Sequence, residues 1–304
     1  FRDGEPLTGD AHHAVREAAY GAVSPAQRAD AQRAALRRAA SLGIGTVHEC
    51  GGPRISSEDD FTGLLELAGS EPGPRVVGYW ADLDVERARA LGAAGAAGDL
   101  FVDGSLGSHT ACLHEPYADA PHTGTAHLEA ADVAAHVVAC TEAGLQAGFH
   151  AIGDAALTAV TDGLRAAAGK LGLARVRAAR HRVEHAEMLT PETVAAFAEF
   201  GLTASVQPAF DAAWGGEDGM YAQRLGAARA RTLNPYAALL RAGVPLAFGS
   251  DSPVTPLDPW GTVRAAAFHR TPGHRVSVRA AFTAHTRGGW RAVGRDDAGV
   301  LVPG

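Results

Sequence analysis

The stretch AFGSDSPVTPLDP, residues 247–259, is the part of the sequence around which the rest can be organised. Its first residues end an apolar run, 244–248, that is typical of a buried strand. The run stops abruptly at Gly249-Ser250-Asp251, before a proline-rich loop. Asp251 is therefore expected at the carboxyl end of a strand. In α/β barrels that end carries the chemistry, because the loops there converge on the barrel axis.

Two earlier segments end in the same way. LQAGFH, residues 145–150, ends at His150, and RHRVEH, residues 180–185, ends at His185. Taken singly, a histidine in an apolar strand is more often a buried core residue, and an aspartate after a strand is often a turn or cap residue. Three such side chains at successive strand ends together predict that His150, His185 and Asp251 are the ligands of one metal ion.

The second of these strands has two faces. By the two-residue period of a strand, His181, Val183 and His185 share one face, and Arg182 and Glu184 share the other. Because His181 lies deeper in the strand, we predict that it is structural.

Apolar strand patterns alternate with helical ones along the whole chain. We predict strands over residues 44–49, 75–79, 100–103, 145–150, 180–185, 202–206 and 244–248. We predict helices over residues 11–23, 25–42, 85–91, 130–143, 155–170, 191–200 and 235–242. Such alternation predicts an α/β fold with parallel strands, and 304 residues suit a TIM-type (β/α)8 barrel in one domain over residues 1–304. A closed barrel needs eight strands. Either the first strand is missing from this sequence, or the pattern conceals one.

Charge, apolar content and cysteine spacing restrict the kinds of molecule that this protein is expected to bind. The formal net charge is -7, and the basic residues form no stripe, which argues against nucleic acid. No apolar run reaches the ~20 residues of a membrane span, so we expect a cytoplasmic protein with a small-molecule substrate and no membrane partner; a homo-oligomer stays open. The three cysteines form no CxxC pair, which argues against a disulfide scaffold and a thiolate zinc site.

The predicted ligands suggest a chemistry. A zinc-type ion held by imidazoles and a carboxylate lowers the pKa of its bound water from ~15.7 to near 7. Asp251, as general base, would take the proton of that water and later deliver it to a leaving amine. The predicted reaction is hydrolysis of an amide or a similar C–N bond.

A glycine-rich loop, residues 101–111, follows the third predicted strand. Its polar residues Asp103, Ser105 and His109 are predicted to bind substrate at the barrel mouth, as is His48 after the first predicted strand. The alternative is a turn without a ligand. The loop carries neither GxGxxG nor GxxxxGK, so it is not a dinucleotide or phosphate loop.

The order of several short motifs resembles one family. DGSLGSHTA, EPYAD, HAIGD, RHRVEHAEML, SVQP and GSDSPVTPLDPW together resemble amidohydrolase family 3, the N-substituted formamide deformylase-like metal-dependent hydrolases. The resemblance extends over nearly the whole chain. It implies a TIM-type barrel, a divalent metal such as zinc, His150 and His185 as ligands, and Asp251 as ligand and base.

The sequence departs from that family at four points. No two of the 14 histidines are separated by one residue, whereas the family's first strand carries an HxH metal-binding pair. Asp99 stands where many relatives have a lysine able to bridge two metals, and His109 stands where an arginine is usual. We also expect the first strand and the flanking β-sandwich to be absent. The rival interpretation is a non-catalytic or incomplete barrel that binds a small ligand or needs a partner segment; isomerase or deaminase chemistry is a third.

Overall fold

A curved sheet of seven parallel strands forms the centre of the molecule. The computed structural model describes residues 9–53 and 55–303. The strands are β1 Thr46–Gly51, β2 Arg75–Trp80, β3 Gly95–Ala96, β4 Gln146–Ala151, β5 Arg182–His185, β6 Thr203–Val206 and β7 Leu246–Phe248. They pair in sequence order from β1 to β7, each parallel to the next. The prediction of an α/β barrel-type fold with seven visible strands is confirmed.

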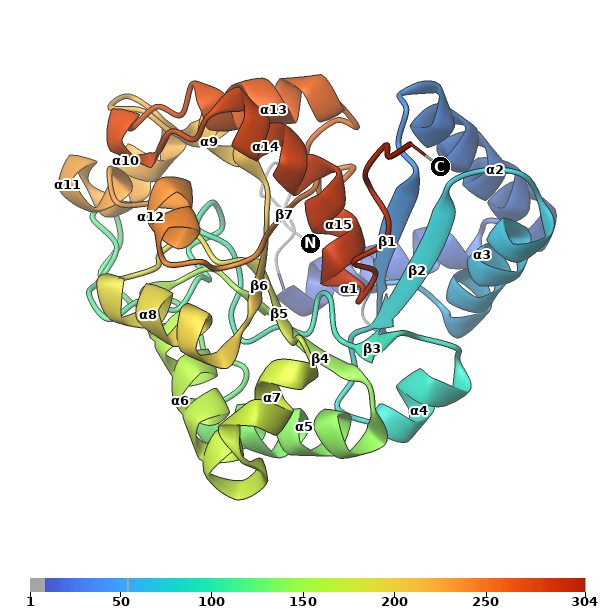
Figure 1. Cartoon of the computed structure of the whole chain (residues 1–304), viewed down its shortest axis with the longest axis horizontal. Helices are drawn as coiled ribbons and strands as arrows, with labels where there is room; N and C mark the ends of the chain where they lie inside the picture. The colour runs from blue at the N-terminus through green and yellow to red at the C-terminus, as the bar shows by residue number, and fades with distance from the viewer. Residues whose placement is uncertain (1–8, 54, 304) are drawn as a thin grey trace.

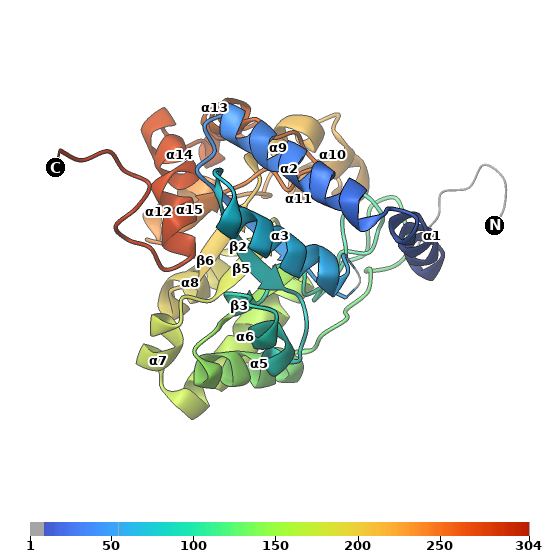
Figure 2. The same ribbon diagram turned by 90° about the vertical axis from the view of Figure 1, so that its right-hand side faces the viewer.

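Most helices of the described chain surround the sheet on its outer side (Figure 1), and α1 lies apart from the strands (Figure 2). They are α1 Gly9–Gly21, α2 Pro25–Ser41, α3 Glu58–Ser70, α4 Val85–Ala90, α5 Ala130–Ala143, α6 Asp154–Leu171, α7 Leu173–Ala178, α8 Pro191–Phe200, α9 Pro208–Trp214, α10 Met220–Leu225, α11 Ala227–Ala230, α12 Tyr236–Arg241, α13 Pro259–Ala267, α14 Val278–His285 and α15 Arg287–Ala292, with a 3-10 turn at Pro272–His274. Figure 2 shows α2 and α3 lying side by side next to β2.

Local sequence signals explain several helix ends. Ser24 caps α2 in a capping box with Gln27, and Pro25 occupies the first turn. The chain leaves α2 through Gly43, whose φ of 78° favours glycine. The prediction for this helix is therefore confirmed to within one residue of its end.

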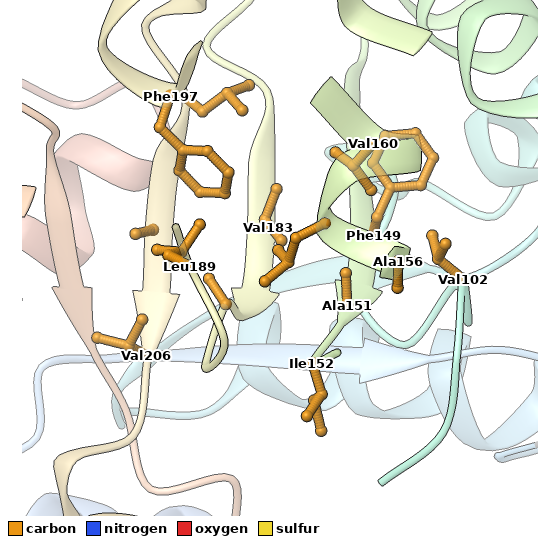
Figure 3. Close-up of a cluster of buried hydrophobic side chains, with 14 of the residues drawn as sticks. Val102, Phe149, Ala151, Ile152, Ala156, Val160, Val183, Leu189, Phe197 and Val206 are labelled. Atoms are coloured by element: carbon orange, nitrogen blue, oxygen red, sulfur yellow. The ribbon is translucent and has the colours of Figure 1, made fainter. Parts of the chain in front are cut away.

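The main core lies between the outer face of the strands and the helices. Phe149 of β4 and Val183 of β5 are buried there with Val160 of α6 and Phe197 of α8 (Figure 3). Since residues alternate along a strand, the neighbours of Phe149 and Val183 face the inside of the curved sheet. His150 is one of these inward-facing residues.

One predicted strand is displaced in the structure. The third strand is β3 Gly95–Ala96, and residues 100–103 form no strand. The chain bends at Gly98, with φ 89°, and Phe101 makes a single parallel bridge with His150. Leu100 and Val102 are buried, so the apolar pattern was read correctly as core but wrongly as a strand. Helices α3, α7, α9 to α11 and α13 to α15 were not predicted.

The two ends of the strand order are β1 and β7. Helix α15 packs against β7, and its Gly289 lies next to Thr46 of β1 (Figure 1). The prediction of one domain over residues 1–304 is not tested, and residues 1–8, 54 and 304 lie outside the described part. Among the residues described, no helix has the length and apolar character that a membrane span requires.

Candidate metal centre

A large cavity opens at the carboxyl ends of the strands. Its volume is about 2100 Å³, and it also extends along β1, between that strand and β7. Small-ligand pockets usually measure ~300–1000 Å³, so the cavity exceeds what one small substrate fills. His150, His185 and Asp251 all line it. The three predicted ligands therefore share one cavity.

The two histidines are in direct contact. The ring centroids of His150 and His185 lie 4.5 Å apart, with the rings at 70° to each other. His185 Nδ1 lies 2.8 Å from the side-chain oxygen of Gln207, which as an acceptor requires a proton on that nitrogen. The lone pair of His185 is then on Nε2, the arrangement that a metal-binding imidazole needs.

The backbone turns His185 into this cavity. Strict alternation would place His185 outside the sheet with Val183, but His185 has φ 70° and Ala186 has φ 47°. Asp251 has φ 53° as well. Left-handed conformations of residues other than glycine cost roughly 1–3 kcal/mol each and cluster at functional sites. Two of the three predicted ligands are thus held in conformations that the backbone does not favour.

The Asp251 carboxylate interacts with both rings. Burial raises its pKa, the charges of Asp99 and Glu184 raise it further, and His185 and His150 oppose the rise. For His150, burial lowers the pKa, but the nearby carboxylates of Asp103, Asp99 and Asp251 raise it by more. The pKa of His150 is therefore raised overall. Mutual influence of this kind requires the groups to be close together.

The donor set fits a divalent ion of the zinc type, because two imidazoles and one carboxylate are common zinc ligands. His150 Nδ1 is buried and has no hydrogen-bond partner among the described residues. As the side chains are placed, however, no three histidine, cysteine, aspartate or glutamate residues in the described ranges are grouped closely enough to hold an ion. The two imidazoles are brought together by the fold, and the carboxylate faces them from a greater distance.

Asp103 is a completely buried centre of hydrogen bonds. Its carboxylate accepts the backbone N–H groups of Cys112 at 2.8 Å, Ile152 at 3.0 Å and Gly153 at 2.8 Å. Its Oδ1 lies 3.7 Å from Nδ1 of His150. Asp103 does not line the cavity, so its side chain ties the 101–111 loop to the end of β4 next to His150.

The other predicted substrate residues lie in three different environments. Ser105 lines the cavity and bonds Ser108 within the loop, at 2.9 Å between their hydroxyls. His109 does not line it and pairs instead with Asp119 at 2.9 Å. His48 lines the cavity lower down, and burial together with the charge of Arg182 lowers its pKa to about 3, which keeps it neutral.

Near His150 and His185 lies a buried ion pair that the sequence did not single out. Arg182 donates to Glu184, to Ser205 Oγ at 2.8 Å and to His48 Nδ1 at 3.2 Å. Its guanidinium also lies over the Tyr79 ring, 4.4 Å from the centroid. The signal was present in the sequence, since two charges at alternate positions of an apolar strand need partners on the inner face.

Glu187 was also missed. It follows His185 by two residues, lines the cavity and is only 3% exposed. Burial raises its pKa to about 7, and the neighbouring Tyr221, His185 and Asn234 only partly oppose this. The Glu187 Oε2 atom and the Tyr221 hydroxyl are buried without a hydrogen-bond partner among the described residues.

His181 lies on the outer face, away from the cavity. Its Nδ1 accepts the Ala147 backbone N–H at 2.9 Å, and its Nε2 lies 3.0 Å from the Thr141 hydroxyl. That hydroxyl itself donates to Val137 O at 2.6 Å, so it accepts from Nε2. A proton on Nδ1 would break the bond to Ala147, so His181 serves the packing between α5 and β4 in its neutral form.

This histidine makes stability depend on pH. Burial, and to a lesser degree His136, lowers its pKa to about 4 from the ordinary 6.5. Between these values the unfolded chain binds the extra proton, so stability falls as pH is lowered from 6.5 towards 4. We expect His181→Gln to reduce the loss of unfolding free energy between pH 6.5 and 4.5 by about 2 kcal/mol, measured by urea unfolding.

The matched control is His127→Gln, since His127 is exposed. The control should leave the pH slope unchanged. An equal slope in wild type and His181→Gln would contradict the assignment of a neutral, buried His181.

Comparisons with known proteins identify the family and agree with the fold. A family model described as Amidohydrolase family matches residues 5–304. Protein LONG AFTER FAR-RED 3 of Arabidopsis thaliana is 34% identical over 215 residues, 67% of this chain and 36% of that protein. YtcJ of Bacillus subtilis (strain 168) is 30% identical over 177 residues, 57% of this chain and 31% of YtcJ. This chain thus spans about a third of these relatives' length.

A solved structure is similar over almost the whole chain. The crystal structure of an uncharacterized metal-dependent hydrolase from Pyrococcus furiosus superposes with a TM-score of 0.77 and 25% identity. The superposition covers 97% of this chain and 62% of that one.

Proposed function

This chain belongs to the amidohydrolase family, and from that premise we propose that it is the core of a metal-dependent hydrolase acting on an amide or similar C–N bond. The observation that carries the proposal is the contact between His150 and His185 at two strand ends, with Asp251 facing both. The left-handed backbone at His185 and Asp251 supports it, because such conformations persist where function needs them.

The proposed metal is zinc, held by His150, His185 and Asp251. When bound, the ion would supply Lewis-acid activation of water and of the substrate carbonyl. Gln207 holds the His185 ring in one orientation through Nδ1, and Asp103 lies next to Nδ1 of His150. We propose that both residues position the ligands, as groups behind metal-binding histidines commonly do.

Asp251 is proposed to move the proton. Its carboxylate would accept a proton from the attacking water and deliver it to the leaving nitrogen, so that no free amide anion has to form. Ser105 and His48, which line the cavity, are the proposed polar contacts to substrate; contacts from Asp103 and His109 stay predictions.

Metal content tests the proposal directly. We expect the purified protein, after dialysis against zinc, to retain about one ion per chain, and His185→Asn to retain less than a tenth of that. The control is His127→Asn at an exposed position, which should bind like wild type. Hydrolysis of a panel of N-substituted amides by the zinc-loaded protein, with colorimetric detection of released amine, tests the reaction class.

A second candidate is a ligand-binding protein without catalysis. It is favoured by the absence of a closed three-ligand group among the described residues. A folded protein that stays metal-free after dialysis and hydrolyses none of the amides would favour this candidate and overturn the hydrolase.

A further inference from the structure

A ring of side chains lies beside His185 on the cavity wall. His185 stacks on Phe210 at 5.8 Å between centroids, and Phe210 contacts Trp214 at 4.8 Å. Trp214 meets Tyr221 edge to face at 6.2 Å, and Tyr221 faces the Glu187 carboxylate. Glu187 follows His185 by two residues along the chain, and the charge of His185 lowers the pKa of Glu187, so this carboxylate lies within electrostatic range of His185 and completes the ring. All five residues line the cavity.

Two polar groups of this ring lack partners. Glu187 is 3% exposed and Tyr221 is 2% exposed, yet Glu187 Oε2 and the Tyr221 hydroxyl form no hydrogen bond within the described residues. The groups that most influence the Glu187 carboxylate are Tyr221, His185, Asp103 and Asn234, and none of them is a permanent cation. A buried carboxylate without a cation is costly, so a partner supplied by a ligand would be strongly favoured.

The surrounding wall carries excess negative charge. Three arginines and no lysine line the cavity among the described residues, and one of them, Arg182, is already paired with Glu184. Seven carboxylates line it: Glu49, Asp60, Asp99, Glu184, Glu187, Asp251 and Asp258. Carboxylates therefore outnumber arginines on this wall by seven to three, and a wall with an excess of acidic groups attracts cations.

We propose that Glu187 and Tyr221, with the rings of Phe210 and Trp214, form a subsite that takes a protonated amine on the substrate. An ammonium group has N–H donors for both the carboxylate and the phenol oxygen, and aromatic faces stabilise a cation within about 6 Å. The inference rests on the proposed function for its place next to the reacting bond, and it adds the substrate class: an amide or related compound that also carries a cationic amine.

Binding of three probes of similar shape tests the subsite without any reaction. The probes are 2-phenylethylammonium, 2-phenylethanol and 3-phenylpropionate, titrated into the purified protein by NMR or calorimetry. We expect the cation to bind at least tenfold more tightly than the alcohol and the anion to bind most weakly. Glu187→Gln keeps the shape but removes the charge, and it should abolish the preference for the cation while leaving the alcohol's affinity unchanged.

Two further variants keep the test decisive. The control Glu142→Gln makes the same change at an exposed position of α5 and should keep the preference. If Glu187→Gln does not fold, Tyr221→Phe serves instead, and it should reduce the preference several-fold. Absence of a cation preference in wild type, or its survival in the folded Glu187→Gln variant, would overturn the subsite. Cation binding without amide hydrolysis would support the subsite and count against the proposed function, so the two can fail separately.

Discussion

Replacing Asp251 with asparagine is expected to reduce kcat/KM for amide hydrolysis by about a thousandfold, within the range of general acid–base catalysis. Asparagine has almost the same shape but cannot accept the proton of the attacking water at neutral pH. Because His150 and His185 contact each other independently of Asp251, we expect part of the metal binding to survive. The measurements are steady-state kinetics on zinc-loaded protein and zinc content of the same samples.

The control for this variant lies in the same loop. Asp258 accepts the Gly261 N–H at 2.9 Å as the cap of α13, and asparagine is an equally good cap. Asp258→Asn should therefore keep wild-type activity and stability. Full activity of zinc-loaded Asp251→Asn would show that the base has been wrongly assigned.

The second large effect concerns folding. Arg182→Met is expected to lower the free energy of unfolding by about 3–5 kcal/mol, because it leaves the Glu184 carboxylate buried without its cation. The loss should exceed that of an ordinary surface arginine several-fold, since Arg182 also bonds Ser205 and covers the Tyr79 ring. Urea unfolding at pH 7 followed by circular dichroism measures the effect.

Two variants separate charge from packing in this prediction. Arg182→Met combined with Glu184→Leu removes both charges and should recover at least half of the loss, because apolar residues of similar volume often replace a buried ion pair without penalty. Arg165→Met, at an exposed position, should cost less than 1 kcal/mol. A double variant no more stable than Arg182→Met would mean that packing, and not the unpaired charge, causes the loss.

Much of the architecture was accessible from local patterns. The alternation of short apolar runs with helical segments predicted a sheet of seven parallel strands, six of them overlapping the observed ones, and it placed helix 25–42 to within one residue of α2. The pattern failed at residues 100–103, where apolar residues pack as a loop after the bend at Gly98. Burial is visible in a sequence, but the choice between a buried loop and a buried strand depends on hydrogen-bond partners that lie far away in the chain.

For the candidate site, too, the sequence predicted one part and only the tertiary structure decided the other. The sequence determined that His150, His185 and Asp251 lie at or just after strand ends, because each closes or follows a short strand-like segment. Only the tertiary structure decided which way they point: the left-handed turn at His185 reverses the direction that strand alternation predicts, and it brings this ring against His150. It also decided that Asp103 is enclosed by backbone N–H groups, and that Glu187 and Tyr221 face a shared cavity. Strand ends follow from local chemistry, whereas side-chain direction and pairing depend on a backbone that is fixed by packing of the whole barrel.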